Sequence, residues 1–396
     1  MISALALLSL QPIFCRLAHA EAPVAAAAVV DAPAVADEGG KAEEKRESAA
    51  TEAAENADKH LDIDPIGLVQ LWGTVYDMDV NPQADTTGYG DPEDDTGVKV
   101  KRARLGVRAK WGDIDAALVG GAGAKYDAFS EDETNFSLYQ ASLGWGSVVG
   151  ACRVKVDAGV IEMPFQADAM ISSGELTFEE RGMAAEHIAD DRGTGISGAV
   201  GSKGGGIKGT LGVYNSGFNP FGDDNLGKSF VFRVDGKVGK RDTTVLWDPA
   251  SERHGAGVGL GAAGLYTIDV STTTMGAAAD VVVRDQGLSL FGEGTVAQIK
   301  PTATTVTAPE VTDPTMRMGV TGEVNYAIGR WQPAARVSYY SDSALGNWTQ
   351  VLMGLNMHIG MKNDPDIVRI GAGYVLRIES DPVPNDTVRI WAQAKI

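Results

Sequence analysis

The sequence predicts an all-β fold: a transmembrane antiparallel up-and-down β-barrel, most simply of sixteen strands. Three observations support this prediction. From Leu68 to the C-terminus, segments of about ten residues alternate between apolar and polar side chains, and Gly, Asp, Asn and Pro interrupt them. The polar positions carry Arg and Lys too often for the core of a soluble sandwich. No run of about 18 apolar residues follows the first 20 residues, which disfavours a helical membrane protein.

Residues 1–20 predict a cleaved signal peptide. The stretch MISALALLSLQPIFCRLAHA is largely apolar and ends in Ala18-His19-Ala20, which matches an A-x-A cleavage pattern. No Lys or Arg precedes the apolar stretch, and Arg16 follows it. An uncleaved anchor and a different start codon therefore remain as alternatives.

Residues 21–64 predict an Ala- and Glu-rich periplasmic linker, disordered or helical. Its 44 residues hold 12 acidic and four basic side chains and no aromatic residue. Such a segment is too polar to form its own core, so disorder is favoured over a solvated helix or short coiled coil. Residues 65–396 then form the barrel domain.

The clearest hairpin signal lies between residues 316 and 340. In MRMGVTGEVNY, Met318, Val320 and Val324 share one face, and after a tight connection near Gly329 the segment WQPAARVSYY alternates again. Residues 366–380 and 386–396 repeat the pattern. Period-2 alternation with short turns indicates antiparallel hairpins.

About seventeen such segments can be counted, and sixteen is the nearest even number, as expected for a bacterial single-chain barrel. The alternative is a secreted β-sandwich or β-helix whose polar face lies in water. A β-helix needs a short repeat, which the sequence lacks. Lipid accounts for the apolar face, and a closed barrel satisfies every backbone polar group in lipid.

The segment VKVKRARLGVRAKW (98–111) places Arg102, Arg104, Arg108 and Lys110 on one face of an expected strand. Short turns belong on the periplasmic side, so Arg104 would lie roughly 15 Å above the turn that follows, near mid-membrane. A charge facing lipid at that depth costs several kcal/mol, which favours the lumen.

The turn after this strand sets the expected partners of the four cations. A tight turn at residues 111–112 would pair the two cations nearest to it with Asp113 and Asp115. Arg102 and Arg104 would then have no acidic partner.

The same alternation predicts a cation-rich lumen wall on other strands. Acidic side chains on these faces are fewer, and a cationic wall lowers the barrier for anions. The predicted pore-lining, anion-contacting residues are Arg102, Arg104, Arg153, Lys155, Arg233, Lys237 and Arg336.

Composition and motifs disfavour other classes of function. A net charge of −19 argues against nucleic acid as a partner, because phosphate binding requires surplus cations. The histidines lie in no recognisable nucleophile pattern, and the sequence lacks Cys/His metal spacing. We therefore expect no catalytic residue, no metal and no cofactor, and an outer-membrane barrel enzyme is the least supported alternative.

Three stretches resemble the phosphate-selective porin O/P family of outer-membrane proteins. KRARLGVRAKWGDIDAALVG (101–120) is similar to the family's early Arg-Arg-Ala-Arg hairpin, and residues 354–396 resemble its closing hairpins. Residues 157–198 are similar to its Gly-x-x-x-x-Pro-Phe segment with the Ser-Ser and Thr-Phe-x-x-Arg elements that follow. The resemblance implies a sixteen-stranded, trimeric porin whose loops fold inward. The chain departs from the family by ending in Ile396 rather than an aromatic residue, and its aromatic content of 7% is modest.

Residues 163–195 are the expected inward loop. They hold seven acidic side chains, and the basic ones are Arg181 and Arg192. An interpretation that stands beside anion selectivity is that wall cations balance these acids and set up a transverse field. The constriction-loop candidates are Asp168, Glu175, Glu179, Glu180, Arg181 and Arg192.

Together these observations predict an outer-membrane porin of a Gram-negative-type bacterium. It would form a water-filled channel for passive diffusion of small hydrophilic solutes, with a leaning toward inorganic anions such as phosphate. Its expected partners are outer-membrane lipid, these solutes and two further copies in a homotrimer. The alternative is a barrel that mainly tethers the outer membrane to the cell wall through its N-terminal segment.

Overall fold

The computed structural model describes residues 60–77, 97–122, 137–188, 190–216, 227–239, 256–302, 313–361, 364–379 and 386–396. The signal peptide expected at 1–20 and residues 21–59 of the expected linker lie outside these ranges.

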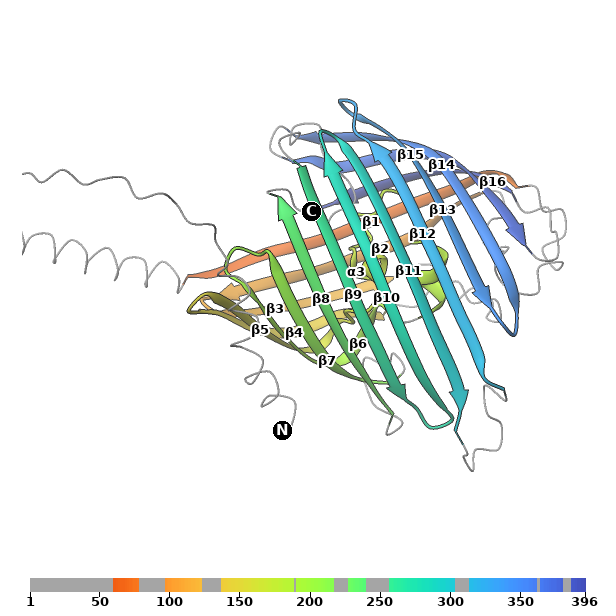
Figure 1. The fold of residues 1–396 in the computed structure, drawn as a ribbon. Coiled ribbons are helices and arrows are strands. Elements are labelled where there is room, and N and C mark those ends of the chain that lie inside the picture. The colour runs from red at the N-terminus through yellow and green to blue at the C-terminus, as the bar shows by residue number, and fades with distance from the viewer. Residues whose placement is uncertain are drawn as a thin grey trace, which may run out of the picture.

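Within the described ranges, sixteen antiparallel strands close into one barrel, which confirms the predicted fold class (Figure 1). Each strand pairs with its neighbours in sequence, and β1 pairs with β16. The strands are β1 (Leu61–Asp77), β2 (Gly97–Trp111), β3 (Ile114–Ala122), β4 (Ser137–Val149), β5 (Cys152–Glu162), β6 (Arg192–Ser202), β7 (Ile207–Asn215), β8 (Lys228–Gly239), β9 (Ala256–Ile268), β10 (Thr272–Asp285), β11 (Leu288–Pro301), β12 (Thr315–Tyr326), β13 (Trp331–Asp342), β14 (Gly346–Met361), β15 (Asp364–Glu379) and β16 (Thr387–Lys395).

The connections differ at the two ends of the barrel. Two-residue turns join β2 to β3, β4 to β5 and β10 to β11, at the end where β1 begins and β16 ends. At the opposite end, residues 163–191 connect β5 to β6. Short turns lie on the periplasmic side of outer-membrane barrels, so this long connection starts from the extracellular side.

The turn between β2 and β3 lies one residue later than the sequence predicted. Trp111 continues β2 and pairs with Ile114, so the turn consists of residues 112–113, and Gly112 has the left-handed φ of 58° that this turn requires. Lys110 therefore faces Asp115 rather than Asp113. The predicted register was wrong because an aromatic residue at the strand end extends the ladder instead of entering the turn.

The second partner of β2 is β1, which begins at Leu61, inside the range expected for the linker. Its residues Asp62 and Asp64 lie opposite Lys110 and Arg108. The two cations nearest the turn therefore face acidic residues across the strand pair, and Arg108 faces one in β1 instead of the predicted Asp115.

Apolar side chains cover the outside of the barrel, and polar ones line the inside. The outward-facing side chain of Leu105 on β2 is 72% exposed. The inward-facing side chains of Arg369 on β15 and Arg389 on β16 are almost completely buried. This is the inverse of a soluble protein and is the arrangement that lipid requires. In the described residues, no helix is both long and apolar enough to cross a membrane.

Replacing Leu105 with lysine is expected to lower the free energy of unfolding by about 2–4 kcal/mol, because it places a charge on the lipid face near mid-membrane. Ala109→Lys, on the same face nearer the short turn, should cost only about 0–1 kcal/mol. Equilibrium urea unfolding in lipid vesicles measures both. Equal losses for the two variants would contradict the assignment of this face to lipid.

Candidate functional site

The connection between β5 and β6, residues 163–191, folds into the barrel, and we call it the inward loop (Figure 1). It carries two short helices, α3 (Ala167–Met170) and α4 (Met183–His187). Leu176 and Thr177 at its centre are almost fully buried. It ends at Asp191, because β6 begins at Arg192, whereas the expected end was residue 195.

The apolar anchor of the inward loop is Phe178, which is 0% exposed. It packs in a buried cluster with Trp391, Leu352 and Val375 of the barrel wall. The Trp391 ring meets it edge-on, with ring centroids 6.2 Å apart. A Cβ on Gly354 would lie 3.1 Å from the Phe178 ring, so this glycine leaves the room that the ring occupies.

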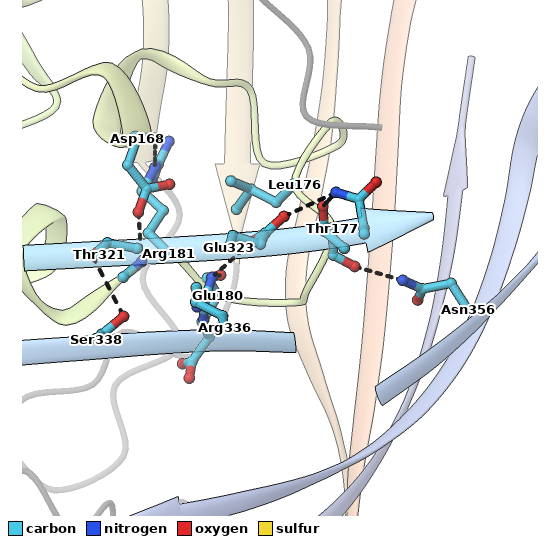
Figure 2. Close-up of polar contacts among 12 residues, drawn as sticks. Asp168, Leu176, Thr177, Glu180, Arg181, Thr321, Glu323, Arg336, Ser338 and Asn356 are labelled. Carbon is cyan, nitrogen blue, oxygen red and sulfur yellow. Dashed lines mark hydrogen bonds and ion pairs between the residues drawn. The ribbon is translucent and has the colours of Figure 1, made fainter. Parts of the chain in front are cut away.

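Wall side chains satisfy the backbone of the inward loop. Asn356 donates to the Thr177 carbonyl at 2.8 Å, and Arg336 donates to the Glu180 carbonyl at 2.6 Å (Figure 2). Arg369 donates to the Leu176 carbonyl. The loop carbonyl groups are buried away from water and have no strand partner, and these side-chain donors satisfy them. The bonds therefore hold the loop against β13–β15.

Loop glutamates form ion pairs with cations of the wall. Lys101 Nζ lies 3.0 Å from Glu180, and Arg389 Nη1 lies 2.9 Å from Glu180 and 3.3 Å from Glu179. Burial would raise the pKa of Glu180, but the charges of Lys101 and Arg389 hold that pKa well below its ordinary value. Lys395 pairs with Glu175 at 2.6 Å. At these positions the wall cations balance loop acids, as the alternative interpretation of the sequence proposed.

Asp168 stabilises the fold of the inward loop itself. Its carboxylate accepts a 2.6 Å hydrogen bond from the Gly182 N–H, and Arg181 Nε donates to its carbonyl at 3.1 Å. Burial raises the pKa of Asp168, although Arg336 and the Gly182 N–H oppose that shift. A Cβ on Gly182 would lie 2.2 Å from the Thr321 hydroxyl oxygen, so only glycine lets the loop approach β12 this closely.

Two interior lysines on β5 and β7 are partly exposed. Lys155 lies 2.8 Å from Asp157 and 3.8 Å from Asp115, and its side chain is 46% exposed. Lys208 is similarly exposed and lies 3.3 Å from Asp235. Both lysines lie near the end of the barrel that carries the short turns, where the inward loop does not cover them.

Arg233, by contrast, is buried beside two carboxylates. Its guanidinium lies 2.6 Å from Asp235 and 2.7 Å from Asp280. Arg153 and Lys237 lie on the interior face of β5 and β8 and are directly opposite Gly201 and Gly259. Within the described residues, neither of these two is bonded to the inward loop. The role of these cations in permeation stays a prediction.

Arg102 and Arg104, which the sequence left without partners, have partners in the structure. Arg102 donates to the Gln70 side chain at 3.1 Å and to the Glu179 carbonyl at 2.7 Å. The Arg104 guanidinium lies 3.5 Å from the centroid of the Tyr139 ring. Among the described residues neither cation forms an ion pair with a carboxylate, as the sequence predicted, but both have partners from distant parts of the chain.

A second arginine, Arg192, lies 4.0 Å from the centroid of the same Tyr139 ring and 3.0 Å from Glu162. Arg181, 3.5 Å from Asp191, lies close enough to Arg104 to repel it. We call Arg102, Arg104, Arg181 and Arg192 the arginine cluster.

Two residues that sequence reasoning missed, Lys101 and Tyr139, lie at β-bulges. Gln70 of β1 pairs with Arg102, and the next residue, Leu71, pairs with Val100. Lys101 is therefore the extra residue of β2. Val119 of β3 pairs with Gln140, and the next residue, Gly120, pairs with Leu138. Tyr139 is therefore the extra residue of β4. A bulge re-aims a side chain and breaks strict alternation, which is why the period-2 pattern did not reveal either residue.

Comparison with models of known protein families matches residues 76–336 to phosphate-selective porin O and P. The chain belongs to this family. It is thus an outer-membrane porin of Gram-negative bacteria, and a channel rather than an enzyme is the function that this family indicates. Among the described residues, no group of three or more His, Cys, Asp or Glu side chains is placed to hold a metal ion.

Solved structures show the same fold at low sequence identity. The anion-selective porin from Comamonas acidovorans has a TM-score of 0.55 and 12% identity, over 85% of this porin and 100% of that chain. A loop L8 deletion mutant of the outer membrane protein OmpT of Vibrio cholerae has a TM-score of 0.56 and 10% identity. This match covers 85% of this porin and 99% of that chain. Salmonella typhi OmpF in complex with daunomycin has a TM-score of 0.53 and 10% identity. This match covers 86% of this porin and 99% of that chain. No curated protein sequence matches the porin significantly.

Proposed function

We propose that the porin passes small hydrophilic solutes by passive diffusion and favours inorganic anions. The observation that carries this proposal is the arginine cluster inside the barrel. Its member Arg104 contacts the Tyr139 ring, and among the described residues it contacts no carboxylate. A guanidinium without an acidic partner is the group that attracts a passing anion most strongly.

The remaining wall cations contribute less in this proposal, because acids neutralise them. Lys101 and Arg389 pair with loop glutamates, and Arg233 pairs with two aspartates. The inward loop narrows the lumen by covering the wall that carries Lys101 and Arg389. Selectivity would then depend on a few groups near the loop rather than on the whole basic row of β2.

The comparisons support the solute class and an assembly. The Comamonas acidovorans porin with this fold is anion-selective, and the family is described as phosphate-selective, so phosphate is among the anions we propose. The OmpT structures include a trimer form, and we propose a homotrimer for this porin.

Reversing the charge of Arg104 is expected to lower the anion-to-cation permeability ratio. Arg104→Glu changes the local charge by two units at about 7 Å from a permeating ion. In water this changes the energies of an anion and a cation by on the order of 1 kcal/mol each, in opposite directions, and salt screening reduces both by about half, so the ratio should fall roughly fivefold. Reversal potentials in a KCl gradient across a planar bilayer measure this ratio.

Arg108→Glu is the matched control, because it makes the same change on the same face of β2 nearer the short turn, opposite Asp64. It should move the ratio by less than half as much. A cation-selective wild type, or equal shifts for the two variants, would refute the proposal.

A further inference from the structure

Tyr139 lies between two arginines that come from opposite directions along the wall. The strand order is β2, β3, β4, β5, β6, so Arg104 reaches Tyr139 of β4 from one side and Arg192 reaches it from the other. Both guanidinium groups lie within 4.0 Å of the centroid of the ring. This geometry is that of a cation–π contact on each side.

The environment of Arg104 makes the ring its main attractive contact. Arg102, Arg181 and Arg192 all lie close enough to Arg104 to repel it, and the Tyr139 ring contacts its guanidinium at 3.5 Å from the ring centroid. Arg192 and Arg181 each have a carboxylate partner, whereas Arg104 has none among the described residues. Without the ring, Arg104 would be free to leave the cluster.

Gly121 provides the path by which Arg104 reaches the ring. It lies directly opposite Arg104 in β3, between β2 and β4. A Cβ at Gly121 would lie 3.4 Å from Arg104 Cγ and 3.8 Å from Tyr139 Cβ. The arginine side chain therefore crosses β3 over a position that carries no side chain.

The hydroxyl group of Tyr139 takes no part in this arrangement. Its oxygen is buried and has no hydrogen-bond partner among the described residues. The contact with both arginines is made by the face of the ring, so phenylalanine should preserve it.

We infer that Tyr139 is a positioning residue for ion selectivity: its ring holds Arg104 and Arg192 together inside the barrel. The anion preference of the porin then depends on a residue that carries no charge. This inference rests on the proposed function and extends it to a neutral specificity-determining residue.

The test compares two neutral substitutions in planar-bilayer reversal-potential measurements. Tyr139→Phe should keep the wild-type anion-to-cation permeability ratio, and Tyr139→Leu should lower it by about threefold, the size of a partly exposed cation–π contact. Neither variant changes the net charge. In an Arg104→Gln background, Tyr139→Leu should have little further effect, because its action passes through Arg104.

Gly121→Val is an independent second variant that leaves the ring in place and blocks the path of Arg104. It should lower the ratio in the same direction as Tyr139→Leu, and resistance of the barrel to heat in detergent verifies that each variant is folded. Loss of selectivity in Tyr139→Phe, or an unchanged ratio in both Tyr139→Leu and Gly121→Val, would overturn the inference while the wild type stays anion-selective. A wild type without anion preference would instead refute the proposed function.

Discussion

Replacing Arg389 with methionine is expected to weaken docking of the inward loop by about 3–5 kcal/mol, the cost of breaking a buried ion pair on one side. Arg389 is fully buried and contacts both Glu179 and Glu180. Lys101 would still pair with Glu180, but Glu179 would keep a buried charge without a partner. Arg181 is buried in the docked loop, so trypsin can cleave after it only when the loop opens. The rate of this cleavage in the folded barrel, measured at increasing urea concentrations, therefore gives the free energy of loop docking.

Two matched variants isolate the buried charge as the cause. Lys395→Met removes a pair whose groups are partly exposed, and it should cost at most about 1 kcal/mol. Adding Glu179→Gln to Arg389→Met should restore much of the lost docking, because it removes the orphaned charge. No recovery in the double variant would show that packing of Arg389, rather than charge, holds the loop.

The same ion pairs make loop docking depend on pH. The folded-state pKa of Glu180 is held below the ordinary value of 4.5, so the pair stabilises docking fully above that value. This stabilisation is lost as the pH falls through the lowered pKa of the folded state. The difference between wild type and Arg389→Met should therefore shrink as the pH falls below 4.5 toward the lowered pKa of the folded state.

Replacing Phe178 with alanine is expected to cost about 3–5 kcal/mol in docking of the inward loop, as is usual for deleting a fully buried phenylalanine. The cavity would open between Trp391 and Leu352, where the wall cannot collapse because the strands are hydrogen-bonded on both sides. A loosened loop should raise the single-channel conductance and its noise. Single-channel recording and trypsin cleavage after Arg181 measure the two effects.

Phe232→Ala is the matched control, because the Phe232 side chain faces lipid on β8 and is 54% exposed. It deletes the same group without touching the loop, so it should leave conductance and cleavage after Arg181 unchanged. Unaltered conductance in Phe178→Ala, despite faster cleavage, would mean that the loop does not narrow the channel.

The alternation of side chains was enough to predict the barrel and most of its interior. Arg104, Lys155 and Arg233 lie on the interior faces that period 2 assigned to them, because a strand has no other way to separate lipid from the lumen. The inward loop was also expected, at residues 163–195, because the resemblance to the porin family implies a loop that folds into the barrel. Its partners were not predictable, because Arg389 and Lys395 lie more than two hundred residues away from Glu179 and Glu175 in sequence.

The sequence by itself determined the fold class and the side of the wall on which each regular strand residue lies, because one face of every strand must meet lipid. The tertiary structure alone decided which groups the interior cations contact. Two bulges turn Lys101 and Tyr139 inward against the alternation, and β1 brings acids to Arg108 and Lys110. Such pairings depend on register and on a loop that crosses the lumen, and both are properties of the closed barrel rather than of any single strand.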